Sequence, residues 1–87
     1  MKIWFKEIKK GKTICDCIID ADENDTRTHK VLNSLDKAAH KLDLAVPIWL
    51  DNNINEFKRN AKTRFTQDSF VEEITFDYLE MAVVEED

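Results

Sequence analysis

The chain has 87 residues, with 43% hydrophobic and 36% charged side chains, and it carries a net charge of −5 at neutral pH. This composition, with one glycine and one proline, excludes collagen-like, linker-like and intrinsically disordered chains. The length favours one domain over residues 1–87, whose small core leaves little room for a deep catalytic cavity.

No stretch of the sequence is suited to crossing a bilayer. The longest run free of charge, residues 44–50, is far shorter than the ~20 residues that a membrane-spanning helix needs. The first residues alternate charged with bulky side chains and lack the apolar stretch of a secretory signal. We therefore expect a cytoplasmic protein with no membrane partner.

The chain is predicted to begin with a β-hairpin. Residues 2–9 and 12–20 are rich in β-branched and aromatic side chains, and Gly11 lies between them, which is the pattern of two strands joined by a tight turn. Side chains alternate across a strand. The first strand should therefore bury Phe5 and present Trp4 on the face opposite the core.

The second strand contains both cysteines, Cys15 and Cys17. One register buries them together with Ile19, and the other register buries Asp16. Because an unpaired buried carboxylate is costly, we expect the cysteines to lie in the core as small hydrophobic side chains. They are too close in sequence to join distant parts of the fold, so we expect reduced thiols.

A long helix is predicted next. Apolar residues recur with a 3.6-residue spacing from Val31 to Leu42, which is typical of an amphipathic helix. Asp25 or Thr26 can cap its first amides. Pro47 prevents the helix from continuing.

A short second helix and a final strand should complete the chain. Residues 53–56 fit a capping box, and apolar residues recur at helical spacing over the same stretch. These residues are Leu50, Ile54, Phe57 and Ala61. From residue 74 to residue 84 apolar and polar side chains alternate, which predicts a strand. The fold class is therefore α+β.

The order of these elements resembles the ubiquitin-like β-grasp fold. Residues 1–6 and 11–14, followed by an acidic approach to a helix, are similar to the opening of ubiquitin, and residues 63–70 are similar to a later stretch of that fold. The resemblance implies a sheet with the helix packed on one face and the last strand parallel to the first. The tail, residues 85–87, has no Gly-Gly pair, so conjugation to a lysine is not implied.

A second resemblance is to short bacterial proteins of unknown function. It is carried by four sequence stretches, PIWLD (residues 47–51), NEF (55–57), TRF (63–65) and ITFDYLE (74–80). This resemblance implies no activity.

Catalytic and metal-binding roles are poorly supported by the sequence. It has no glycine-rich phosphate loop and no nucleophile elbow. Cys17 is expected to point inward, whereas His29 and His40 should lie on the outward side of the long helix, about 16 Å apart at the helical rise of 1.5 Å per residue. We expect no enzymatic activity, no cofactor and no metal.

The remaining function classes are interaction modules. Trp4 is a candidate interface anchor, although it could instead pack under the acidic C-terminal segment. The basic side chains Lys58, Arg59, Lys62 and Arg64 form a candidate contact strip. These features favour an adaptor that binds another protein or a second copy through an open sheet edge. The alternative is single-stranded nucleic acid bound through residues 58–64, which the acidic total charge disfavours.

Overall fold

The computed structural model describes residues 1–87 and has an α+β fold, as the sequence predicted. Its elements in chain order are β1 (Lys2–Lys9), β2 (Lys12–Asp20), α1 (Arg27–Lys41), α2 (Asp51–Asn60), β3 (Lys62–Phe65), a short 3-10 turn (Gln67–Ser69) and β4 (Tyr78–Glu85). None of the helices is long and apolar enough to span a bilayer.

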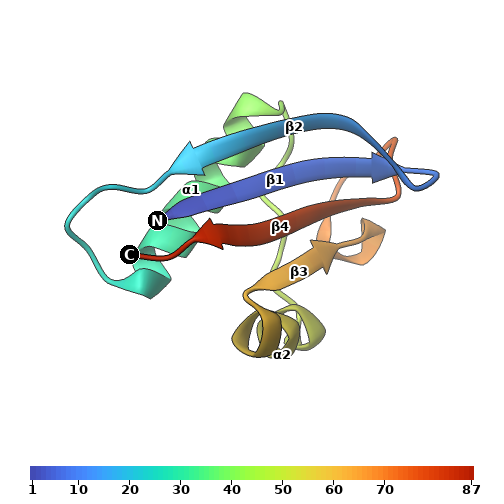
Figure 1. Cartoon of the computed structure of the whole chain (residues 1–87). Coiled ribbons are helices and arrows are strands. Elements are labelled where there is room, and N and C mark those ends of the chain that lie inside the picture. Colours follow the sequence, from blue (N-terminus) through green and yellow to red (C-terminus); the bar gives the residue numbers. More distant parts are fainter.

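The four strands form one sheet in the order β2-β1-β4-β3 (Figure 1), and every neighbouring pair is antiparallel. The succession of hairpin, helix and later strands is consistent with a β-grasp-like order. The expected parallel last strand is wrong, because β4 runs antiparallel to β1. The chain returns to the hairpin-turn end of β1, where the Asp77 amide donates to the Ile8 carbonyl at 2.9 Å, so β4 must run back along β1.

The hairpin turn forms where the sequence indicated it. Lys10 and Gly11 have φ values of 52° and 77°, and two consecutive positive φ angles are characteristic of the type I′ turn that suits a twisted hairpin. The side chain of Asp77 accepts the Lys10 amide at 2.8 Å. This bond joins the turn to the start of β4.

The core lies between the sheet and α1. Thr26 is the N-cap, and its hydroxyl oxygen accepts the His29 amide at 3.2 Å. Figure 1 shows α1 lying behind the sheet, and no helix covers the opposite face. We call that opposite side the outer face. The fully buried members of the core include Ile3, Phe5, Phe65, Leu79 and Met81.

The expectation that both cysteines are core residues is wrong for Cys15 and holds only in part for Cys17, which packs against the core. The register is the expected one, since Ile19 is buried and Asp16 is exposed. However, Cys15 is exposed and Cys17 is only half-buried, because β2 is an edge strand with no neighbour on its far side. Partial burial raises the pKa of the Cys17 thiol. Both thiols are free.

Candidate protein-interaction surfaces

The predicted site residues fall on two parts of the molecule. Trp4 in β1 and Lys62 and Arg64 in β3 point to the outer face, because their strand neighbours Phe5, Thr63 and Phe65 are buried. Lys58 and Arg59 lie in the last turn of α2 and are exposed. The four basic residues of the predicted contact strip therefore lie on two different elements, two on α2 and two on β3.

Two complete cross-strand rows of side chains cross the outer face. Strand register places the members of each row side by side on β2, β1, β4 and β3. The charged row is Asp16, Lys6, Glu80 and Arg64. The tryptophan row is Ile18, Trp4, Ala82 and Lys62.

Trp4 is half-buried in the surface of the sheet. Its indole Nε1 donates to Asp16 Oδ2 at 2.8 Å, and the Lys6 ammonium lies 4.2 Å from its ring centroid. The expected position opposite the core is therefore correct. Its role as an interface anchor stays a prediction.

Glu80 neutralises part of the basic strip. Its carboxylate lies 3.2 Å from Lys6, 3.8 Å from Lys62 and 3.9 Å from Arg64, although the residue itself is only 8% exposed. In contrast, Lys58 and Arg59 form no ion pair. The uncompensated part of the strip is thus on α2.

A groove of about 410 Å³ lies between α1 and α2. Five of its lining side chains are apolar, and Arg27 on α1 and Lys58 on α2 add a cation from each helix. Leu32 and Ile54 are 43% and 39% exposed there. The apolar lining is Val31, Leu32, Trp49, Ile54 and Phe57.

Aromatic packing fixes the floor of this groove. Trp49 packs edge-to-face against Phe57 and Phe65, with ring centroids 5.6 Å and 5.1 Å apart. The Arg27 guanidinium lies 5.2 Å from the Phe57 ring centroid. The Trp49 Nε1 is buried and has no acceptor.

Asn53 holds α2 against β3. It is 1% exposed, and its side-chain amide donates to Thr63 Oγ1 at 2.9 Å and to the Arg64 carbonyl at 2.8 Å. Its side-chain oxygen accepts the Leu50 amide at 3.1 Å, so Leu50 is the N-cap in place of Asn53 and α2 begins at Asp51, three residues before the predicted start. A buried amide with these partners fixes the position of the helix because leaving them unpaired is costly.

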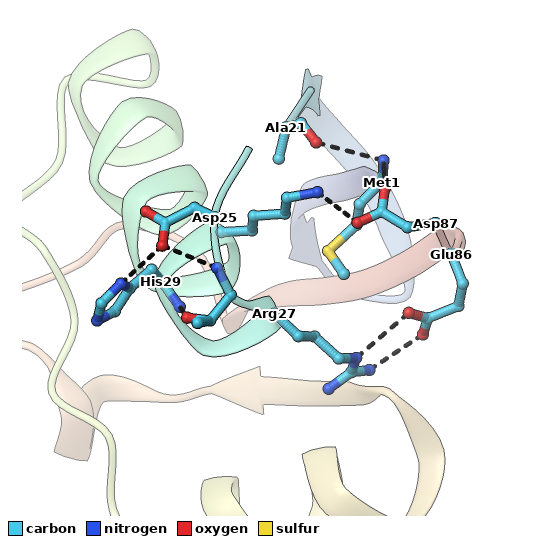
Figure 2. Close-up of polar contacts among 9 residues, drawn as sticks. Met1, Ala21, Asp25, Arg27, His29, Glu86 and Asp87 are labelled. Atoms are coloured by element: carbon cyan, nitrogen blue, oxygen red, sulfur yellow. Dashed lines mark hydrogen bonds and ion pairs between the residues drawn. The ribbon is translucent and has the colours of Figure 1, made fainter. Parts of the chain in front are cut away.

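The acidic C-terminal residues lie beside the start of α1 (Figure 2), where Arg27 also lines the groove. Glu86 accepts two hydrogen bonds from Arg27, at 3.2 Å and 3.0 Å. Asp87 pairs with Lys30 and with the Met1 amine, the latter at 2.6 Å. The hydrogen bonds from Arg27 lower the pKa of the Glu86 carboxyl, and those from Lys30 and the Met1 amine lower the pKa of Asp87.

The sequence interpretation missed the groove because it arises only when two helices meet. Ile54 was expected on a buried face, but it is exposed, and α2 contacts β3 through Asn53 and Glu56 instead, both of which bond to Thr63. Leu32 was expected on the apolar face of the long helix, and Arg27 was not among the predicted site residues. One sequence signal could have revealed the groove. Leu32 and Ile54 are apolar side chains that lie outside the buried positions of their helices.

The titratable side chains do not form a cluster of the kind that binds a metal ion. No group of three or more His, Cys, Asp or Glu side chains is placed to hold one metal ion. His29 pairs with Asp25 at 2.9 Å, and this bond lowers the pKa of that carboxyl. That the protein is not an enzyme stays a prediction.

Comparison of the chain with models of protein families, with curated proteins and with solved structures gives no match.

Proposed function

We propose that the protein is a non-enzymatic interaction module that binds an acidic amphipathic helix of another protein in the groove between α1 and α2. The single observation that carries this proposal is an apolar groove flanked by Arg27 and Lys58. A helix that places an apolar face in such a groove is a recurring mode of peptide recognition. Cations beside the groove favour acidic flanks on the bound helix.

The chain's own tail supports this choice of partner chemistry. Arg27, which lines the groove, already holds the Glu86 carboxylate. A partner carboxylate could take the same place, and Glu86 would then act as an internal competitor. Lys58 has no carboxylate partner and is free to receive another acidic side chain.

The test uses a synthetic peptide with leucines at i, i+3, i+4 and i+7 and glutamates on both flanks of that face. In a Trp4→Phe background, Trp49 is the only tryptophan and its fluorescence reports events in the groove. We expect the acidic peptide to change this fluorescence saturably. A peptide with lysines in place of the glutamates should bind much more weakly.

Substitutions at the exposed apolar positions locate the binding site. Leu32→Asp and Ile54→Asp should each weaken peptide binding about tenfold or more, because they place a charge against an apolar face. Val71→Asp is the matched control at a side chain that is 84% exposed and outside the groove. Glu86→Gln should tighten binding roughly two- to fivefold, since it removes the internal competitor.

Single-stranded nucleic acid is the second candidate, because Lys58 and Arg59 are exposed and carry no ion pair. Oligothymidine is therefore a separate arm of the same titration. Saturable oligothymidine binding with a steep salt dependence, together with equal affinity for the acidic and basic peptides, would overturn the proposal.

A further inference from the structure

The outer face of the sheet has a pattern of side chains that is complementary to itself. Along the charged row, from β2 to β3, the signs alternate as minus, plus, minus and plus. The same row read in the opposite direction has the opposite sign at every position. A second copy that faces this sheet with its strand order reversed therefore presents an opposite charge to each member of the row.

We propose that two copies of the chain form a symmetric dimer by packing their outer faces together, about a two-fold axis that runs parallel to the strands between β1 and β4. Such an interface is isologous, so each contact occurs twice. Sheets that pack face to face keep their strands approximately aligned. This proposal is independent of the groove, which lies on the other side of the sheet.

The charged row supplies the first set of matched contacts. Asp16 lies opposite the partner's Arg64, and Lys6 lies opposite the partner's Glu80. Asp16 and Arg64 are both exposed, so their side chains can turn toward the second copy. Glu80 keeps its pair with Lys6 at 3.2 Å and gains a further cation, the partner's Lys6.

The tryptophan row supplies the apolar centre. The axis places Trp4 over the partner's Ala82, which sets a large side chain against a small one, as facing layers of a packed core require. Ile18, which is 52% exposed, lies over the aliphatic stem of the partner's Lys62. Lysine stems cover apolar surface readily while the ammonium stays in water.

The alternative axis, perpendicular to the strands, gives a poor match. It would lay the charged row of one copy on the tryptophan row of the other, so that Lys6 and Glu80 would be buried against apolar side chains. Lys6 and Glu80 would keep their pair with each other, but they would be buried without gaining an opposite charge from the second copy, which is costly. The pattern therefore specifies one orientation.

Pairing through an open sheet edge, which the sequence favoured, is opposed at the β2 edge by a local irregularity. The register between β1 and β2 shifts between Glu7 and Ile8, where β2 carries one extra residue. Bulges of this kind are a common device by which edge strands avoid pairing. The outer face, where both rows are in regular register, is the better contact.

The test measures self-association by sedimentation equilibrium over a concentration series, with two charge reversals and their mixture. Asp16→Lys and Arg64→Glu should each weaken the dimer about tenfold or more, because each places like charges opposite one another twice. An equimolar mixture of the two variants should form a heterodimer with near wild-type affinity, since every contact is then of opposite sign. Asp36→Lys, the same charge change on exposed α1, should leave association unchanged.

The rescue on mixing separates a contact between copies from an effect within one chain, because a variant damaged internally stays damaged in the mixture. Ala82→Trp provides a second test that leaves all charges in place, and it should also abolish the dimer by filling the space for the partner's Trp4. A wild-type chain that sediments as a monomer at millimolar concentration would overturn the proposal. So would a mixture that associates no better than its two components.

Discussion

Trp49 and Trp4 show how differently the two sides of the sheet use the same residue type. Trp49 packs between Phe57 and Phe65 on the helix side, and its indole N–H is buried without an acceptor. Trp4 lies on the outer face, where its N–H donates to Asp16. The helix side thus uses a tryptophan for packing, whereas the outer face keeps one in a polar network that a second surface can cover.

The largest expected effect comes from truncating each tryptophan in turn. Trp49→Ala should lower the free energy of unfolding by about 3 kcal/mol, because it removes aromatic packing next to Phe65 and leaves a cavity. Trp4→Ala should cost only about 1 kcal/mol, since the ring is half-buried and covers no core. Urea unfolding monitored by circular dichroism measures both.

Trp49→Phe is the control for this comparison. It keeps an aromatic ring and removes the unpaired buried donor, so its cost should be much smaller than that of Trp49→Ala. If Trp4→Ala were as destabilising as Trp49→Ala, Trp4 would be a structural residue, and the outer face would lose its role as an interface.

An intermediate effect is expected from the residue that joins α2 to β3. Asn53→Leu removes both donors from Thr63 and the Arg64 carbonyl and leaves the Leu50 amide without its acceptor. We expect a loss of about 2 kcal/mol in unfolding free energy. The variant should also weaken peptide binding in the groove while the self-association constant changes little. If peptide binding and self-association were weakened equally, the groove and the outer face would not be independent surfaces.

The elements that depend on local pattern could be predicted from the sequence. The Gly11 turn, the Thr26 cap and the periodicity of α1 all act over a few residues, and each is found where the pattern placed it. The register of β2 followed from the cost of burying Asp16. Each of these features is determined by interactions within a short stretch of the chain.

The features that depend on distant contacts could not be predicted in this way. β3 has only four residues, two of them basic, and it becomes a strand because β4 pairs with it. Cys15 is exposed because β2 lies at the sheet edge. The rows of the outer face require the register between strands, which no single strand specifies.

The smallest expected effect is a loss of folding stability in acid, which arises from ion pairs on the helix side of the sheet. The folded-state pKa of Glu86 is lowered from its ordinary value of 4.5 by the hydrogen bonds from Arg27. The stabilisation from this pair is therefore complete above pH 4.5 and is lost as the pH falls through the lower folded value. Asp87, whose pKa is lowered in the same way, adds to this loss in acid.

Glu86→Gln should remove part of that pH dependence. Both side chains of the pair are about half exposed, so solvent screens it, and the cost at neutral pH should be about 0.5 kcal/mol or less. At a pH below the lowered folded-state pKa of Glu86, the variant and the wild type should have the same unfolding free energy, because the wild-type carboxyl is then protonated. Unfolding in urea at a series of pH values measures the difference. A difference that persisted in acid would mean that Glu86 acts through packing and not through its charge.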